Sequence, residues 1–417
     1  MTRILVLTWE YPPLIEGGLA RHVRKLAEGL VVEGIEVHVL SRGDERHPHE
    51  TELDGVVVHR VREPRRPRDL GEFVAWVEHM NADMLAAGVE LGDRFDFDLV
   101  HGHDWLVAVA CDHLANRFGC PYVTTIHATE YGRHQGYVDA HPQRWIHGIE
   151  HSMARRADRV IACSHYMRGH VSDVYGLDED RVAVIPNGID PLDLRPVADL
   201  PTLRAEFAAP HERLVLLVGR LVYEKGFQLA LEALPGLIDR LGDVRFIVAG
   251  SGTHEGLLRE QAVELGLDAH GHFLGWIGDD VLHSLYRIAD LCVVPSIYEP
   301  FGLVALEAMA SGCPCIVADT GGLREVVPHD EVGLRFRSRD PDSLAAMVER
   351  VLCDDALRER LVAEASEHVL RFDWADVARQ TAALYAALGP ARVARKRRDG
   401  VGDRGMIGAP TGAVDRV

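Results

Sequence analysis

The chain has 417 residues, 47% of them hydrophobic, which is enough apolar material for two domains with cores of their own. Its formal charge of −19, from 45 basic and 64 acidic residues, argues against a general nucleic-acid binder, because such a protein needs a basic face. Seven cysteines without a CxxC pair, no signal-peptide pattern and no apolar run long enough to span a bilayer predict a cytoplasmic protein.

The first predicted unit is a strand over 3–9, a loop, a helix over 19–32 and a second strand over 35–40. The loop holds Gly17 and Gly18 directly before the helix, where glycine backbone can approach a phosphate closely. A tight turn that binds nothing would have the same sequence. Because the loop lacks the GxGxxG pattern and no acid follows at the spacing used for a dinucleotide ribose, the sequence argues against an NAD-dependent enzyme.

The densest basic run inside the predicted domains covers 59–68, with the sequence HRVREPRRPR. Such a run attracts anionic lipid or an acidic acceptor, and it is the segment that would offer a membrane contact. Pro64 and Pro67 favour the other interpretation, a solvated loop.

Four further strands are predicted in the first half, and a polar residue lies at or just after the end of each one. Ligands of an open parallel sheet bind beyond the carboxyl ends of its strands, so we expect these polar residues to line one crevice. The strands cover 99–100, 122–126, 159–162 and 182–185, and the residues are His101, His127, Ser164 and Asn187.

The segment from His101 to Trp105, with the sequence HGHDW, has two interpretations. Two histidines and an aspartate after a strand resemble part of a zinc site, but the other histidines form no second spaced motif, so we predict no metal. Asp104 and Trp105 are then acceptor-side candidates, because a carboxylate accepts hydroxyl hydrogen bonds and an indole face stacks on a sugar ring. His127 is another candidate for the reaction centre, although a strand-end histidine is commonly a structural donor.

The second half repeats the opening pattern. A strand is predicted over 213–219, a loop over 220–226, a helix over 227–241 and a strand over 244–249. Two such units predict an α/β protein with two Rossmann-like, doubly wound parallel-sheet domains.

The loop of the second unit carries two cations, Arg220 and Lys225. Oriented cations in a dry cleft stabilise the charge that builds on a departing diphosphate. The alternative is that both are ordinary surface charges. We favour the functional interpretation because two glutamates recur at the same predicted crevice.

Those glutamates flank a predicted helix N-terminus in the segment 298–307. Glu299 lies in the loop before the helix, Gly302 lies near its first turn, and Glu307 lies inside it. At a rise of about 1.5 Å per residue, 302 to 307 spans roughly 7 Å, comparable to a diphosphate with a sugar on each side. The alternative is a solvated Glu299 and a Glu307 that only complements the helix dipole.

The expected domain organisation follows from these units and from the Pro-rich and acidic segment between them. We expect an N-terminal Rossmann-like acceptor domain over 1–192, a linker over 193–211, a C-terminal nucleotide-sugar domain over 212–370, a closing helix over 371–389 that packs back on the first domain, and a disordered tail over 390–417.

Together, several of these motifs resemble a known family over about residues 1–389. The motifs are EGGL at 16–19, HDW at 103–105, PNGID at 186–190, GRLxxEKG at 219–226, and EPFGL at 299–303 with a second Glu at 307. The combination is similar to the large retaining glycosyltransferase family that includes bacterial glycogen synthases, and most similar to actinobacterial α-1,4-glucosyltransferases. The resemblance implies the GT-B fold, with two Rossmann-like domains facing a central cleft.

The resemblance also implies roles for individual residues. Arg220 and Lys225 would hold the donor diphosphate, Glu299 the transferred sugar and Glu307 the nucleotide ribose. The remaining assignments are His127 beside the transferred sugar, Asp104 with Trp105 on the acceptor side, and the backbone of Gly17, Gly18, Phe301, Gly302 and Leu303 at the donor phosphates.

The implied reaction moves α-glucose from ADP-glucose or UDP-glucose to an α-1,4-glucan, with retention and without a metal or other cofactor. A lipid, an inositol phosphate or a small metabolite is the alternative acceptor. A catalytically silent sugar-nucleotide-binding protein is the alternative from another functional class, and the presence of both cations and both glutamates argues against it.

Overall fold

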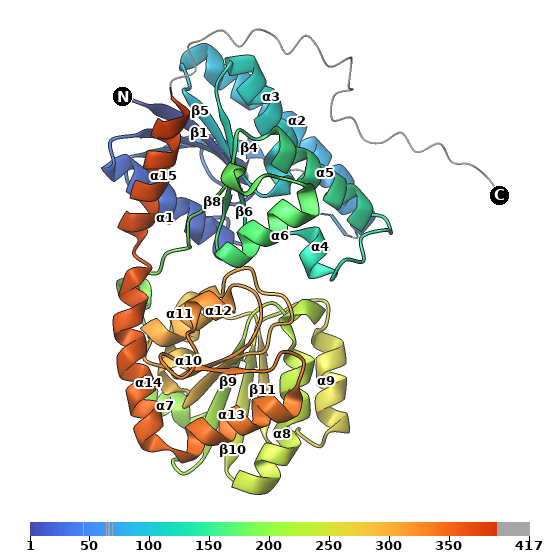
Figure 1. Ribbon diagram of the computed structural model, residues 1–417, viewed down its shortest axis with the longest axis vertical. Coiled ribbons are helices and arrows are strands. Elements are labelled where there is room, and N and C mark those ends of the chain that lie inside the picture. The colour runs from blue at the N-terminus through green and yellow to red at the C-terminus, as the bar shows by residue number, and fades with distance from the viewer. Residues whose placement is uncertain (45, 64, 66, 69, 390–417) are drawn as a thin grey trace, which may run out of the picture.

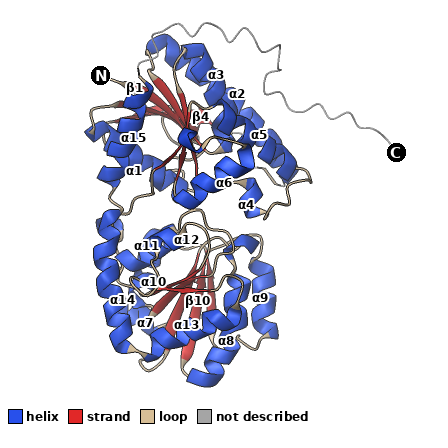
Figure 2. Ribbon diagram, viewed as in Figure 1, coloured by secondary structure: helices blue, strands red, loops and turns tan. Residues whose placement is uncertain are grey.

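The computed structural model describes residues 1–389 apart from 45, 64, 66 and 69, so the tail predicted over 390–417 lies outside the described residues. The chain forms two α/β halves, one above the other in Figure 1. Each half has a sheet between layers of helices (Figure 2). The prediction of two doubly wound parallel-sheet units is confirmed.

Within the described part of the chain, the N-terminal sheet has eight strands in the order β3-β4-β2-β1-β5-β6-β7-β8, and β3 alone runs antiparallel to its neighbour. The strands are β1 Arg3–Leu7, β2 Glu36–Gly43, β3 Glu50–Leu53, β4 Val56–Arg62, β5 Leu99–His103, β6 Tyr122–Ile126, β7 Arg159–Ala162 and β8 Val182–Val184. The helices of this half are α1 Gly18–Val32, α2 Leu70–Arg94, α3 Ala108–Phe118, α4 Glu130–Arg133, α5 Gln143–Arg156 and α6 His165–Tyr175.

The C-terminal sheet is parallel throughout its described strands, in the order β11-β10-β9-β12-β13-β14. Its strands are β9 Arg213–Val218, β10 Val244–Ala249, β11 Gly271–Gly275, β12 Leu291–Val294, β13 Cys315–Ala318 and β14 Leu334–Phe336. The remaining helices are α7 Leu200–Ala205, α8 Phe227–Leu241, α9 Glu255–Glu264, α10 Asp279–Ile288, α11 Leu303–Ala310, α12 Leu323–Val326, α13 Pro341–Cys353, α14 Asp355–His368 and α15 Trp374–Leu388.

The order of the strands fixes where a ligand can bind. In both sheets the winding direction reverses beside the first strand, between β1 and β5 and between β9 and β12. Open α/β sheets bind ligands in the crevice beyond the carboxyl ends of the strands at this point. Because the loops that follow β1, β9 and β12 line one shared cleft, the two switch points face each other.

The segment predicted as a basic loop over 59–68 is partly a strand, which corrects the solvated-loop interpretation. Residues 59–62 belong to β4, and the side chains of His59 and Arg60 are buried. The Arg60 guanidinium donates to Thr51 Oγ1 over 2.6 Å. These two basic side chains are therefore structural, and Arg62, Arg65 and Arg68 remain the exposed basic residues of the described run.

Two segments connect the halves. Helix α7 lies within the predicted linker 193–211, and its Arg204 donates to Asp290 Oδ2 over 2.8 Å, so this segment packs on the C-terminal half. Helix α15 returns to the N-terminal half and runs beside α1 (Figure 1). Tyr385 of α15 forms a 2.6 Å hydrogen bond with His101 Nδ1, deep in the first sheet.

None of the described helices is both long and apolar enough to cross a membrane.

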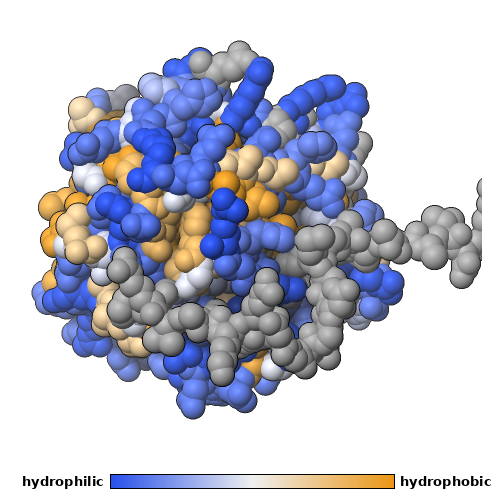
Figure 3. Space-filling model, turned by 90° about the horizontal axis from the view of Figure 1, so that it is seen from above, coloured by the Kyte–Doolittle hydropathy of each residue, from blue (hydrophilic) through white to orange (hydrophobic). Residues whose placement is uncertain are grey.

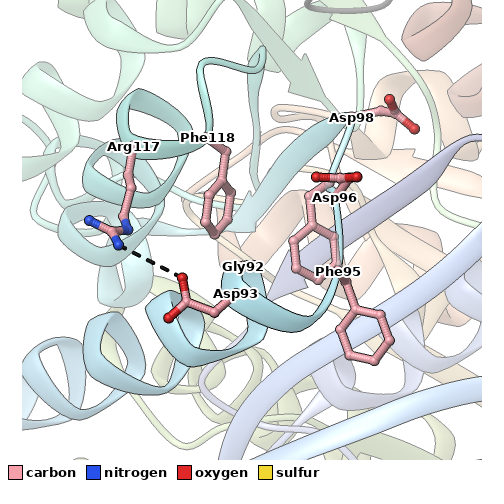
Figure 4. A pocket seen from close by; sticks show the side chains of 8 residues that line it. Gly92, Asp93, Phe95, Asp96, Asp98, Arg117 and Phe118 are labelled. Carbon is pink, nitrogen blue, oxygen red and sulfur yellow. Dashed lines mark ion pairs between the residues drawn. The ribbon is translucent and has the colours of Figure 1, made fainter.

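The end of the N-terminal half that faces away from the other half is a mixed surface of hydrophilic and hydrophobic residues (Figure 3). A pocket of about 380 Å³ lies at the amino end of β5 (Figure 4). Asp93, Asp96 and Asp98 line it, and Arg117 Nη2 lies 4.0 Å from Asp93 Oδ1. Because three carboxylates and, among the described residues, a single cation line it, this pocket is unsuited to a phosphate.

Candidate active site

A cleft of about 400 Å³ separates the two halves and is lined from both of them. The N-terminal half contributes the start of α1 and the loops after β6 and β8, and the C-terminal half contributes the loops after β9, β10, β11 and β12. The predicted site residues that line it are Gly17, Gly18, His127, Arg220, Lys225, Glu299, Phe301, Gly302, Leu303 and Glu307.

The centre of the cleft holds a direct ion pair between two of these residues. Lys225 Nζ donates to Glu299 Oε2 over 2.7 Å, and Ser296 Oγ donates to the same oxygen over 3.0 Å. Glu299 is buried, whereas the side chain of Arg220 beside it is 60% exposed towards the cleft. The pair fixes the carboxylate, and the Arg220 guanidinium, 3.8 Å from Glu224 Oε1, faces the space where a donor would lie.

Helix α11 begins at the cleft, as the sequence predicts. Its N-cap, Gly302, has a φ of 120°, a conformation that favours glycine, and it allows the chain to turn sharply between β12 and α11. The first N–H groups of the helix and its dipole face the cleft beside Glu299 and Lys225. This arrangement suits a negatively charged group.

Glu307 lies on α11 at the edge of the same cleft. Its Oε2 accepts a 2.9 Å hydrogen bond from Tyr286, and its Oε1 lies 3.7 Å from Arg21 Nη1. Burial raises the pKa of Glu307, and the charge of Arg21 opposes this shift. Arg21 also pairs with Asp279 on the far wall, so one side chain of α1 contacts two acids of the other half.

The glycine loop before α1 is held by an acid that sequence reasoning did not select. The Glu10 carboxylate accepts hydrogen bonds from the backbone N–H groups of Glu16 and Gly17. Burial raises the pKa of Glu10, and the two backbone donors oppose this shift. Gly18, the first residue of α1, lies close enough to α11 that a Cβ there would be 3.3 Å from Leu303 Cδ1.

His127, which lines the cleft, lies beside Asp104, which is not among the lining residues. Asp104 Oδ1 accepts from the backbone N–H of His127 over 2.8 Å, and burial raises the Asp104 pKa to about 6 against the charge of Arg133. Burial and the same guanidinium lower the pKa of His127 to about 4. Asp104 adopts a φ of 61°, which is a strained backbone conformation for a residue other than glycine. Residues in such conformations are found most often at functional sites.

The acceptor-side candidate Trp105 and two of the four predicted strand-end residues, His101 and Ser164, are not in the cleft. The Trp105 ring, which we expected to face a sugar, is buried edge-on against Trp145 with centroids 5.8 Å apart, and it lines a separate cavity of about 870 Å³. His101 lies within β5, where Thr125 Oγ1 and Tyr385 satisfy its ring. Ser164 caps α6 and donates to the Pro300 carbonyl over 2.7 Å. Asn187, the fourth strand-end residue, does line the cleft.

Three cleft residues escaped the sequence analysis as individual candidates. Arg133 and Arg21 add positive charge to the N-terminal wall, and the Trp276 ring is 76% exposed in the loop after β11. A tryptophan between Gly275 and Gly278, at a strand end, is a signal that could have been used. The arginines lie on helices, and no sequence pattern shows which face of a helix meets the cleft.

The two halves are joined above and below the cleft by hydrogen bonds. Tyr298 OH accepts from the backbone N–H of Thr129 over 3.1 Å. Glu325, at the start of α12, accepts from the N–H groups of His165 and Tyr166 at the start of α6, over 2.9 and 2.8 Å. The arrangement described here is therefore one in which the halves are in contact.

Comparison with known protein families gives two matches that together cover most of the chain. Residues 16–192 match Glycosyltransferase Family 4, and residues 201–368 match Glycosyl transferases group 1. An uncharacterized glycosyltransferase of Methanocaldococcus jannaschii is 37% identical over 92% of this chain and 97% of its own length.

Two further relatives have named activities. The glycogen synthase of Mycobacterium tuberculosis is 38% identical over 92% of this chain and 94% of its own length. A D-inositol 3-phosphate glycosyltransferase of Frankia alni is 34% identical over 91% of this chain and 96% of its own length.

Among solved structures, the chain is similar to a sucrose-phosphate synthase of Thermosynechococcus elongatus. The TM-score is 0.79 at 26% identity, with 93% of this chain and 99% of the other covered. These matches confirm both the predicted family and the predicted fold class. The chain belongs to the family 4 glycosyltransferases and has the GT-B fold.

Proposed function

We propose that the protein transfers α-glucose, with retention of configuration, from ADP-glucose or UDP-glucose to the non-reducing end of an α-1,4-glucan. The observation that carries the proposal is the Lys225–Glu299 pair beside Arg220 and the N-terminus of α11. It combines a place for a diphosphate with a carboxylate for sugar hydroxyls. The relative named as a glycogen synthase supports glucose as the sugar and glucan as the acceptor.

In the proposed complex, Arg220, Lys225 and the first N–H groups of α11 bind the donor diphosphate. Glu299 accepts hydrogen bonds from the transferred sugar, His127 lies beside that sugar, and Glu307 accepts from the ribose. The exposed Trp276 ring offers the nucleotide base a flat face for stacking.

The transfer step exchanges one bond at the anomeric carbon for another. The bond from the sugar C1 to the phosphate oxygen breaks, and a bond from C1 to the acceptor oxygen forms on the same face. The acceptor proton passes to a donor phosphate oxygen, so no protein base is needed. Arg220 and Lys225 stabilise the charge on the departing diphosphate, which is why we propose that no metal is required.

An anionic acceptor is the second candidate. Arg133, whose charge acts on the acceptor-side candidate Asp104, adds a cation to the N-terminal wall of the cleft, and one relative is named as acting on D-inositol 3-phosphate. Guanidinium groups bind phosphate in a bidentate manner, so a sugar phosphate or inositol phosphate would find partners there.

The experiment is to incubate the purified protein with ADP-glucose or UDP-glucose and a panel of acceptors, and to follow products by mass. Maltooligosaccharides that grow by single glucosyl units support the glucan proposal. Products formed only with phosphorylated acceptors overturn it in favour of the second candidate. If the wild-type protein binds the nucleotide sugar but forms no product with any acceptor, the protein is instead a catalytically silent sugar-nucleotide-binding protein.

A further inference from the structure

Three imidazole rings meet at the N-terminal wall of the cleft. His22 comes from α1, His103 ends β5 and His127 follows β6, and each offers a ring nitrogen within 4.8 Å of the other two. His103 Nδ1 and His127 Nε2 are 3.1 Å apart, and the His22 ring stands edge-on to His127 with centroids 4.6 Å apart. Among the described residues, this is the one group of three or more such ligand atoms gathered so closely.

Several polar atoms in this cluster have no protein partner. Over the described part of the chain, neither ring nitrogen of His22 has a hydrogen-bond partner, nor has His103 Nε2, nor Oδ1 of Asn187, whose amide lies beside His22. An unpaired buried polar atom destabilises the folded chain. A metal ion takes one nitrogen from each ring, so it would give one of the two His22 nitrogens the partner that the protein does not supply.

The protonation state of the rings suits a cation. Burial, followed by the charges of the neighbouring histidines, lowers the pKa of His22 and His103 well below the usual value. The pKa of His127 is lowered to about 4. Neutral imidazole is the form that ligates metals, and a metal held by His103 Nδ1 and His127 Nε2 requires that the proton shared by this pair moves to the other nitrogen of its ring.

The ligand set selects a class of metal. Imidazole nitrogens suit Zn²⁺, Co²⁺, Ni²⁺ and Cu²⁺, whereas Mg²⁺ and Ca²⁺ prefer oxygen ligands. Bonds of about 2.0–2.1 Å place tetrahedral ligand nitrogens roughly 3.3 Å apart. The His103–His127 pair already has this spacing, and the His22 nitrogen lies within 4.8 Å of both, so His22 has to move by at most about 1.5 Å. Three protein ligands leave the fourth position open towards the cleft.

We propose that His22, His103 and His127 bind one transition-metal ion of the Zn²⁺ class, and that the bound ion inhibits sugar transfer. Inhibition rests on the proposed function, in which His127 lies beside the transferred sugar. A His127 ring that ligates a metal is held away from the sugar, and the ion itself occupies the wall of the cleft. The protein would therefore lose activity when free zinc rises and recover it when the ion is removed.

The binding test uses the full chain after treatment with a chelator. Titration calorimetry with ZnCl₂ should show one tight site, and Co²⁺ should give the visible absorption of a tetrahedral nitrogen site. His22→Ala and His103→Ala should each lower the affinity of that site for the metal at least about tenfold. Even the loss of a group that only orients a metal ligand lowers metal affinity by this factor. Circular dichroism would show whether each variant is folded.

The matched control is His38→Ala. His38 belongs to another buried histidine pair, in which Nδ1 lies 2.9 Å from His59 Nε2 and Nε2 lies 3.1 Å from Glu36 Oε1, so its ring has partners. This variant should keep the tight site and its Co²⁺ spectrum. If wild type shows no tight site, or if a folded His22→Ala and His103→Ala bind as wild type does, the metal site is overturned.

The inhibition test compares each protein with its own metal-free rate. Zinc should slow glucosyl transfer by wild type and the chelator should restore it, while His103→Ala should need at least about tenfold more zinc for the same fractional loss. A tight site that leaves the wild-type rate unchanged overturns inhibition and leaves the site standing. Absence of transfer with every donor refutes the proposed function, and the calorimetric and Co²⁺ results still decide the metal site.

Discussion

At the residue scale, the Lys225–Glu299 pair separates two explanations of this cleft. A structural salt bridge and a donor-binding pair look alike in the absence of donor, because both place Lys225 Nζ against the carboxylate. They differ in what a conservative substitution changes. Breaking a structural pair would lower the stability of the protein. Breaking a donor-binding pair would lower turnover in a protein that remains folded.

We expect Lys225→Ala and Glu299→Gln each to lower turnover at least about a hundredfold, equivalent to roughly 3 kcal/mol of transition-state stabilisation. Lys225 would no longer neutralise the departing diphosphate, and the neutral amide would bind sugar hydroxyls less strongly. Steady-state kinetics and thermal melts are the measurements. Arg240→Ala is the control, because Arg240 lies on α8 and its guanidinium pairs with Glu349 of α13 at an exposed position. Near-normal turnover in both cleft variants would remove the pair from the mechanism.

A second residue-scale prediction concerns Asp104, whose pKa is raised from 3.8 to about 6, mainly by burial. The folded state therefore holds the proton more tightly than the unfolded state, so stability falls as pH rises from the unfolded pKa through the folded one. We expect the free energy of unfolding of wild type to fall by roughly 2 kcal/mol more than that of Asp104→Asn between about pH 4 and pH 7. Urea titrations across this range measure it. Parallel profiles for the two proteins would mean that Asp104 ionises normally.

At the element scale, the closing helix α15 depends on a close approach to α1. A Cβ on Gly29 would lie 2.6 Å from Ala378 Cβ, so the two helices touch where neither can accept another carbon atom. The Tyr385–His101 hydrogen bond fixes the same helix deeper in the sheet. The sequence predicted that a helix packs back on the first half, but it gave no sign of either contact.

Gly29→Ala tests this contact against Gly148→Ala in α5. Both sites are inside helices, so each gains about 1 kcal/mol of helix propensity, but a Cβ at Gly148 meets nothing within 4 Å. We expect Gly29→Ala to be less stable than Gly148→Ala by about 1–3 kcal/mol, the usual cost of overpacking. Chemical denaturation measures the difference. Equal stability would show that α15 moves away from α1 at little cost.

Elements with strong local patterns were predicted to within a residue or two. Helix α8 and strands β6, β7 and β10 have the bounds that the apolar periodicity indicates. Strands β3 and β4 were not predicted, because their polar and basic residues are satisfied only by pairing with each other and with β2. Arg60 in β4 illustrates this. Its charge favoured a solvent-exposed position, but its guanidinium donates to Thr51 Oγ1 and to a neighbouring backbone carbonyl.

At the scale of the whole molecule, the contacts between the halves decide how well the cleft excludes water. Glu325 accepts two hydrogen bonds at the N-terminus of α6, and the helix dipole strengthens them. A closed cleft protects a sugar nucleotide from hydrolysis, since water competes with the acceptor at the anomeric carbon.

We expect Glu325→Ala to shift the equilibrium towards an open arrangement roughly fivefold, the equivalent of about 1 kcal/mol for charge-assisted hydrogen bonds at the surface. The radius of gyration from small-angle X-ray scattering should rise, and a larger share of donor should be hydrolysed. Glu359→Ala, at an exposed position of α14, is the control. An unchanged scattering profile and product ratio would show that other contacts hold the halves together.

The sequence by itself determined the two β-loop-α-β units, the cleft loops that carry Arg220, Lys225 and Glu299, and the start of α11, because strand and helix patterns are local and end at defined residues. Only the tertiary structure decided that Lys225 pairs with Glu299, that Trp105 lies outside the cleft, and that His22 meets His103 and His127. These relations depend on strand order and on how helices dock on the sheets. Burial, which shifts the pKa values of Asp104 and His127, likewise exists only once distant segments pack together.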